Sequence, residues 1–217
     1  FYIPANVSNF LTAGMLKNEI NDVLSYYSVS KLDIVSHSMG GLVTMGYLSN
    51  LGKDRFGNSV TYGNNIRKYI AIGSPAHGAF SSNRILLNMN TASTGCNTLA
   101  RIFGIDPTDK NAQAYLDLAV GSEFAWLLHS ASFPTTISYL AITGNEGILC
   151  VPDETKESNS GDPGAGNDGL VAVSSASLLD KSIPLIVLGD YNHANEIGDS
   201  AIPLLTFNPQ REVNIID

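Results

Sequence analysis

The sequence predicts an α/β fold, in which a mostly parallel sheet is covered by helices on both faces. Short apolar runs alternate along the chain with segments whose apolar residues recur at helical spacing. The short runs are apolar throughout, which is typical of strands that are buried in a parallel sheet. The chain has 217 residues, about the size of one large domain, and no internal repeat. We therefore expect residues 1–217 to form a single domain.

Four apolar runs are the main strand candidates, and residues 1–4 resemble the end of another strand. The four runs are residues 32–37 (LDIVSH), 69–73 (YIAIG), 136–143 (TISYLAIT) and 184–188 (PLIVL). Each run is too short for a stable helix. Because the site of such a sheet lies beyond the carboxyl ends of its strands, the segments that follow these runs hold the candidates for chemistry.

Helical spacing marks the segments between the strands. Apolar residues recur at helical intervals in residues 13–27 and 42–48. From residue 79 to residue 133 the pattern is helical but less regular, and we expect a cap or lid insert there. Glycine, asparagine, aspartate and serine crowd residues 154–168, which predicts a loop.

Composition and charge exclude two classes of protein. The formal net charge is −8, whereas proteins that bind nucleic acid usually present a basic surface, so no nucleic-acid partner is expected. No apolar run reaches the roughly 20 residues that a membrane span needs. An acidic, lysine-poor chain rich in Asn, Ser and Thr suits a secreted protein, which we expect, although many cytosolic proteins have a similar composition.

Cys96 and Cys150 are the two cysteines of the chain. Their spacing matches no zinc or redox motif. One disulfide and two buried thiols are both compatible with the sequence.

Residues 36–41 (SHSMGG) stand where a predicted strand ends and a helix begins. A nucleophile on such a turn has strained backbone angles, so the residues two before and two after it must be small, as Ser36 and Gly40 are. The turn would lift the Ser38 hydroxyl clear of the sheet at a helix N-terminus, where the Met39 N–H could donate to an oxyanion. We expect Ser38 to be a nucleophile. The alternative is a serine- and glycine-rich turn that only caps a helix.

His193 is the expected base among the four histidines. It follows the last predicted strand in a turn, from which a loop can hold an imidazole over Ser38. The order serine, acid, histidine along the chain is also the one that goes with a nucleophile on a strand-to-helix turn. His37 is expected to point away from the Ser38 hydroxyl, and His77 to shape the wall near the site. For His193 itself, a surface turn is the alternative.

The acid must lie between these two residues and reach the imidazole nitrogen that does not face Ser38. Asp168, in the Asn-Asp-Gly-Leu-Val stretch at 167–171, is our choice because a polar loop presents it and an apolar run follows it. Glu146 is the rival, because it comes shortly after the strand predicted at 136–143.

With these residues, the chain resembles a lipase of the α/β-hydrolase superfamily. Residues 37–43 (HSMGGLV) are typical of lipases and related esterases. The secreted lipases of the Pseudomonas and Burkholderia group place their catalytic Asp in Asn-Asp-Gly-Leu-Val and their catalytic His in Asn-His followed by acidic residues, and residues 167–171 and 192–196 are similar. Residues 73–78 resemble their Gly-Thr-Pro-x-x-Gly segment.

The resemblance covers roughly residues 30–80 and 135–200 and departs from the family at two places. A structural calcium is implied, but the Asp expected two residues after the catalytic His is Asn195, and Glu146 is the remaining carboxylate candidate. No His-Gly pair, the usual source of a second oxyanion N–H, precedes Ser38. We expect the first strands of the fold and this loop to be missing from the sequence.

The expected function is hydrolysis of acyl esters by a Ser-His-Asp triad through an acyl-enzyme, with no required cofactor. The substrate would be a small-molecule or lipid ester, with transient contact to a lipid interface. Apolar residues of the insert, Phe124, Trp126 and Leu128 among them, would as a set line an acyl pocket, whereas any single one of them is more simply an ordinary core residue. Two alternatives stay open. One is a lipid deacylase or acyltransferase with the same triad, and the other is a non-catalytic binding protein on this scaffold.

Overall fold

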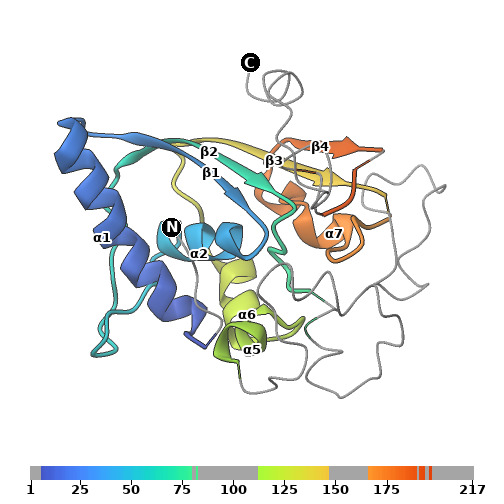
Figure 1. Ribbon diagram of the computed structural model, residues 1–217, viewed down its shortest axis with the longest axis horizontal. Helices are drawn as coiled ribbons and strands as arrows, with labels where there is room; N and C mark the ends of the chain where they lie inside the picture. The colour runs from blue at the N-terminus through green and yellow to red at the C-terminus, as the bar shows by residue number, and fades with distance from the viewer. Residues whose placement is uncertain are drawn as a thin grey trace, which may run out of the picture.

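The computed structural model describes residues 6–79, 82, 112–146, 166–189, 191–193 and 196. Within these residues, four strands form one parallel sheet whose spatial order follows the chain (Figure 1). The strands are β1 (Leu32–His37), β2 (Ile66–Ile72), β3 (Ser138–Gly144) and β4 (Leu185–Leu188). Each apolar run of the sequence overlaps one of them, so the predicted α/β class is confirmed. Among the described residues β1 pairs with β2 alone, and the further strands expected before it stay a prediction.

Two helices lie against one face of the sheet, below the strands in Figure 1. The first, α1 (Asn9–Tyr27), begins earlier than its apolar pattern predicts because the Ser8 side chain caps it by accepting a hydrogen bond from the Phe10 N–H at 3.2 Å. The second, α2 (Met39–Leu48), follows β1 directly and packs against α1.

The hydrophobic core lies between these helices and the sheet. Alternate residues of a strand point to the same face, and on this face Tyr69, Ala71 and Ala141 are buried. They pack in one cluster with residues of both helices, Leu42 and Leu16 among them. The core therefore fixes α2, and with it the turn that joins β1 to α2, against the sheet.

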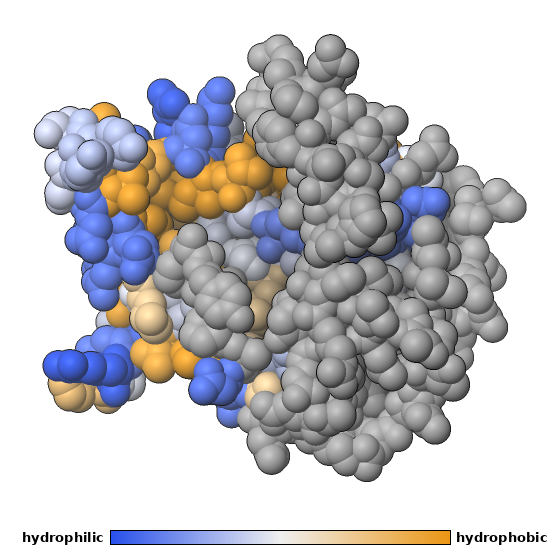
Figure 2. Space-filling model, in the orientation of Figure 1, coloured by the Kyte–Doolittle hydropathy of each residue, from blue (hydrophilic) through white to orange (hydrophobic). Residues whose placement is uncertain are grey.

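The other face of the sheet is also apolar. The pairing register places Val35, Ile70 and Leu140 side by side on it. Val35 is 53% exposed, and Ile186 of β4, on the same face, is 40% exposed. Figure 2 shows hydrophobic surface along the side of the molecule where the strands lie. A sheet that is covered by helices on both faces needs both faces to be apolar. The apolar second face therefore agrees with the predicted cover.

The described part of the predicted insert, residues 112–133, contains the helices α5 (Gln113–Leu118) and α6 (Glu123–Ser130). Phe124 and Leu128 are buried in the core cluster, which is the alternative expected for single residues of the acyl-pocket set, whereas Trp126 is exposed. This part of the insert therefore belongs to the body of the domain. Residues 80–81 and 83–111 of the insert lie outside the described residues.

A buried carboxylate joins the insert to the start of α1. Asp117 accepts hydrogen bonds from the Ser8 hydroxyl at 2.8 Å and from the Asn9 N–H at 2.6 Å. A carboxylate at this position satisfies an N–H group that has no partner within the helix and interacts favourably with the helix dipole.

Three sequence predictions concern residues outside the described part of the chain, namely Cys96, Cys150 and Asn195. They stay predictions. None of the described helices is long and apolar enough to cross a membrane.

Candidate active site

Ser38 occupies a strained turn between β1 and α2. Its φ of 53° and ψ of −132° lie where residues other than glycine rarely occur, at a cost of about 1–3 kcal/mol. The turn is held by the Ser38 N–H, which donates to the Ile72 carbonyl of β2 at 2.9 Å, and by the Ser38 carbonyl, which accepts from the Gly41 N–H at 2.9 Å. The sheet thus supports a strained serine at the carboxyl end of β1, as the sequence predicts.

Two small residues of this turn, Gly41 and Ser36, lie close to β2 and the loop that follows it. A Cβ atom on Gly41 would lie 1.9 Å from the Ser74 hydroxyl oxygen, so no larger residue fits there without rearrangement. Ser36, which stands where glycine is more common, donates a hydrogen bond to the Tyr69 hydroxyl at 2.9 Å. Tyr69 in turn donates to the Gly41 carbonyl at 3.2 Å. The hydroxyl of Ser36 is therefore used to fix the turn to β2.

His193 lies directly beside Ser38. Its Nε2 is 2.8 Å from the Ser38 Oγ, and its Nδ1 is 2.7 Å from Asp168 Oδ2. The ring is buried, and the His193 N–H also donates to the Asp168 carbonyl at 2.7 Å. The structure thus brings the three predicted side chains into one hydrogen-bonded series.

Asp168 is presented by a tight turn before α7 (Val173–Ala176). Its Oδ1 accepts from the N–H groups of Leu170 at 2.9 Å and Val171 at 2.7 Å, which leaves Oδ2 for His193. Glu146, the rival acid, instead accepts a hydrogen bond from the Asn192 side chain at 3.4 Å. Of the two carboxylates, Asp168 is the one that contacts the imidazole.

Met39, the predicted oxyanion donor, is the first residue of α2. The first four N–H groups of a helix have no partner within it, and the helix dipole favours negative charge at this end. The N–H of Met39 therefore follows Ser38 at a position suited to an anionic oxygen.

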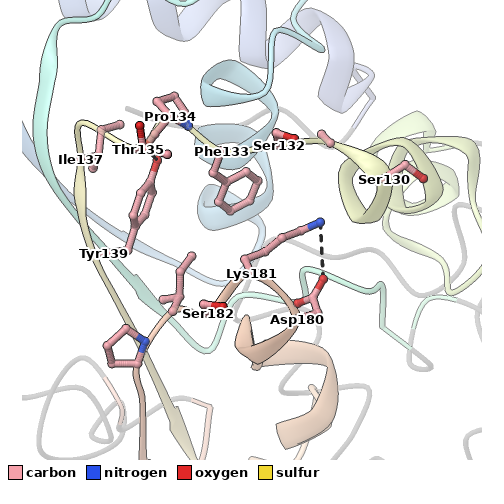
Figure 3. Close-up of a pocket in the computed structure, with 13 residues that line it drawn as sticks. Ser130, Ser132, Phe133, Pro134, Thr135, Ile137, Tyr139, Asp180, Lys181 and Ser182 are labelled. Carbon is pink, nitrogen blue, oxygen red and sulfur yellow. Dashed lines mark hydrogen bonds and ion pairs between the residues drawn. The ribbon is translucent and has the colours of Figure 1, made fainter.

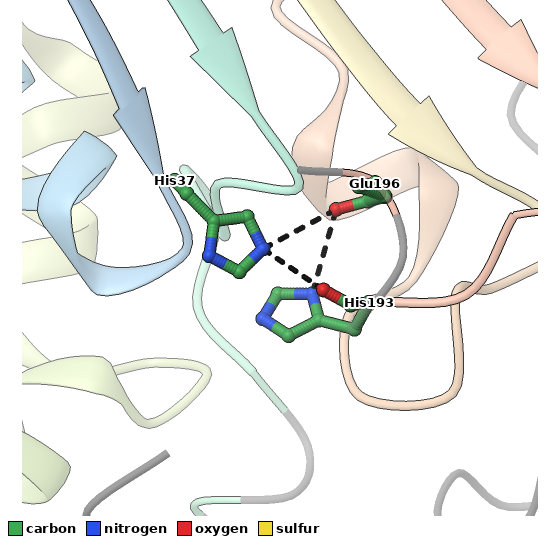
Figure 4. Close-up of side chains that lie close together, drawn as sticks. All are labelled: His37, His193 and Glu196. Atoms are coloured by element: carbon green, nitrogen blue, oxygen red, sulfur yellow. Dashed lines mark hydrogen bonds and ion pairs between the residues drawn. The ribbon is translucent and has the colours of Figure 1, made fainter. Parts of the chain in front are cut away.

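His37 lies behind His193 and contacts it. Its Nε2 is 3.0 Å from the His193 carbonyl oxygen, and the two rings lie 4.6 Å apart (Figure 4). Burial, followed by the neighbouring His193, lowers the pKa of His37 to about 3. The ring is therefore neutral near pH 7, and because a carbonyl only accepts, its Nε2–H donates and holds the His193 backbone.

Glu196 is a buried carboxyl beside the triad that our sequence reasoning missed. One oxygen, Oε1, accepts hydrogen bonds from the Gly144 N–H and from the Thr143 hydroxyl at the end of β3. The other, Oε2, lies 3.7 Å from His193 Nδ1 and 3.6 Å from His37 Nε2 (Figure 4). The sequence did contain a signal for this residue. Glu196 is the acidic residue of the 192–196 segment, which resembles the Asn-His segment of the Pseudomonas and Burkholderia lipases.

Burial and, second, the negative charge of Asp168 raise the pKa of Glu196 well above its usual range. Glu196 therefore holds its proton to a higher pH than an ordinary glutamate does.

Two groups of side chains among the described residues could hold a metal ion. One is His37, His193 and Glu196 within the site, and the other is His77, His129 and Asp180. Neither contains Glu146, so calcium binding by Glu146 and Asn195 stays a prediction.

A cavity of about 660 Å³ lies at the amino ends of β3 and β4 (Figure 3). Residues 130–135, Ile137 and Tyr139 line one side of it, and residues 180–184 line the other. None of them belongs to the triad, which lies at the opposite ends of the strands. We do not assign this cavity to the substrate of Ser38.

No family model matches the chain, and neither does any curated protein. Solved structures do match. The mature form of the lipase BlEst2 of Bacillus licheniformis is 19% identical with a TM-score of 0.57, over 88% of this chain and 69% of that chain. Phospholipase PlaB of Legionella pneumophila is 15% identical with a TM-score of 0.55, over 82% of this chain and 36% of that one.

Lipase 1 of Pelosinus fermentans is 14% identical with a TM-score of 0.53, over 87% of this chain and 71% of that one. Together with the parallel sheet and its helices, these similarities show that the chain has the α/β-hydrolase fold.

Proposed function

We propose that the protein is a serine hydrolase that cleaves carboxylic esters with apolar acyl groups. One observation carries the proposal, namely the hydrogen-bonded series Ser38–His193–Asp168. Its serine lies on a strained strand-to-helix turn at the carboxyl end of β1. A serine that only capped a helix would need neither a buried imidazole on its hydroxyl nor a carboxylate behind that imidazole.

The geometry supports a two-step reaction. Asp168 accepts the Nδ1–H of His193, so Nε2 carries the lone pair that takes the Ser38 proton while Oγ attacks the ester carbonyl. The Met39 N–H stabilises the negative oxygen of the tetrahedral intermediate. His193 then gives the proton to the departing alcohol. In the second step, water attacks the acyl-enzyme through the same base and releases the carboxylic acid.

Lipids are the substrate class that the comparisons favour, because the similar structures are named lipases and a phospholipase. We propose that residues 1–217 form a single domain that resembles the Pseudomonas and Burkholderia lipases, and that the part of the 79–133 insert outside the described residues contributes a lid over the site. A secreted location and transient contact with a lipid surface belong to the same proposal.

A fluorophosphonate ester tests the reaction, because it forms a stable adduct only with an activated serine. We expect one adduct per chain on Ser38, mapped by mass spectrometry, and its loss in His193→Ala. Ser25→Ala, which removes an exposed serine of α1, is the matched control and should be labelled like the wild type. A folded protein without an adduct on Ser38 would contradict catalysis and leave the binding-protein alternative.

A further inference from the structure

A second cluster of histidine and carboxylate side chains lies outside the triad, and the proposed reaction makes no use of it. Its members come from three separate segments: His77 from the loop after β2, His129 from the last turn of α6, and Asp180 from η2 (Leu179–Lys181). One nitrogen or oxygen can be chosen from each so that all three atoms lie within 4.8 Å of one another.

Asp180 lies between the two histidines. Its Oδ1 is 3.7 Å from His77 Nε2, and its Oδ2 is 3.5 Å from His129 Nδ1. Zinc lies about 2.0–2.1 Å from each nitrogen or oxygen that binds it, and in a tetrahedral site two such ligand atoms are therefore roughly 3.4 Å from each other. The two contacts use different oxygens of Asp180, and one atom chosen from each side chain brings all three within 4.8 Å of one another, so side-chain movements would have to shorten these distances to place one oxygen and both nitrogens around one ion.

The hydrogen bonding of His77 provides an independent reason. Its Nδ1 is 3.3 Å from the Ser175 carbonyl oxygen, which can only accept, so Nδ1 carries a hydrogen. This hydrogen bond leaves Nε2, which lies 3.7 Å from Asp180 Oδ1, as the ring nitrogen that faces the cluster and is available to an ion. A histidine that ligates a metal almost always donates its other N–H in this way.

We propose that His77 Nε2, His129 Nδ1 and one oxygen of Asp180 form a binding site for a divalent transition-metal ion of the zinc type. Two imidazoles and one carboxylate are ligands that zinc prefers, and water would complete the coordination. All three side chains are partly exposed, which gives an ion access. The ion would be structural, because it joins the loop after β2, α6 and the segment that follows the Asp168 turn.

Lys181 is the competing cation. Its Nζ lies 3.5 Å from Asp180 Oδ2 and donates to the His129 carbonyl, and Figure 3 shows it paired with Asp180. Bringing a dication next to this ammonium costs free energy. Replacing Lys181 by methionine, which keeps much of the side-chain length, should therefore strengthen metal binding.

The test uses purified protein stripped of metal by chelation. Co²⁺ is added while its visible absorption is followed, and Zn²⁺ binding is measured by calorimetry. We expect one ion per chain, affinity reduced at least 10- to 100-fold in His129→Ala and Asp180→Asn, and several-fold tighter binding in Lys181→Met. Asp33→Asn is the control. It removes an exposed carboxylate at the amino end of β1, distant in sequence from the three proposed ligands, and should not change the affinity for the metal ion.

Thermal unfolding without metal checks that each variant folds, and added Zn²⁺ should raise the melting temperature of the wild type but not of His129→Ala. Binding that is absent, or that persists unchanged in His129→Ala and Asp180→Asn, would overturn the proposal. So would binding that is lost in His193→Ala, because that result would place the ion on the catalytic histidine.

Discussion

At the scale of single residues, the site depends on how each side chain of the triad is held from behind. Ser38 is held by a β2 carbonyl, Asp168 by two backbone N–H groups, and His193 by the Asp168 carbonyl and the His37 ring. Glu196 joins the triad to the end of β3. His37 and Glu196 are thus positioning residues, which do not themselves contact the reacting atoms.

Replacing Asp168 by asparagine tests its assignment as the acid. The amide can present N–H to the ring and so stabilise the wrong imidazole tautomer, and changes of this kind lower kcat by about 10⁴-fold. We expect a loss of that order in kcat for a p-nitrophenyl ester, with a small change in KM. Glu146→Gln is the matched control and should stay within about twofold of the wild type. The reverse ranking of the two variants would make Glu146 the acid.

Replacing Glu196 by glutamine tests its protonation. Because its folded-state pKa is raised above the ordinary value of 4.5, Glu196 binds its proton more tightly in the folded than in the unfolded chain. The resulting stabilisation is fully present below about pH 4.5 and is lost as the pH rises through the folded-state pKa, by about 1.4 kcal/mol per pH unit.

Urea unfolding of wild type and Glu196→Gln at several pH values measures this effect. Glutamine is neutral throughout, so the free energy of unfolding of the wild type should fall relative to that of the variant as the pH rises. A difference that does not change between pH 4.5 and 8 would show that Glu196 is an ordinary carboxylate.

At the scale of elements, α6 is held to α1 and α2 by one aromatic side chain. Phe124 is fully buried, its ring lies edge-on to Phe10 at 4.8 Å, and it contacts α2 beside Gly46. Phe124→Ala should lower the free energy of unfolding by about 3–5 kcal/mol, because it removes buried surface and leaves a cavity.

Trp126→Ala in the same helix is the control, since Trp126 is 67% exposed and its loss should cost about 0.5 kcal/mol or less. Urea denaturation compares the two. Equal losses would mean that α6 does not pack on α1 in the way described.

The same elements show what the sequence could and could not predict. The strands were predictable because both faces of this sheet are apolar, which leaves continuous apolar runs, and the strand-to-helix turn at residue 38 was predictable because it directly follows such a run. The start of α1 was not, because Asn9 is polar yet buried, and its N–H is satisfied by Asp117, more than 100 residues away. Glu196 was missed because its partners are also distant in sequence. Thr143 and Gly144 belong to β3, more than 50 residues earlier in the chain.

At the scale of the whole molecule, the net charge of −8 acts on any lipid surface that the protein approaches. An anionic surface repels a negatively charged protein over about one Debye length, which is roughly 30 Å at 0.01 M salt and 3 Å at 1 M. A protein that hydrolyses esters at an interface must first reach it. The charge therefore predicts a preference for neutral over anionic lipid surfaces that disappears at high salt.

Hydrolysis of an ester dispersed in vesicles measures this preference. We expect several-fold slower hydrolysis in vesicles that contain phosphatidylserine than in pure phosphatidylcholine at 0.01 M salt, and equal rates at 1 M, because screening removes the repulsion. A water-soluble p-nitrophenyl ester without vesicles is the control, and its rate should hardly depend on salt. Equal rates on both vesicles at low salt would mean that the charge is distributed away from the face that meets the lipid.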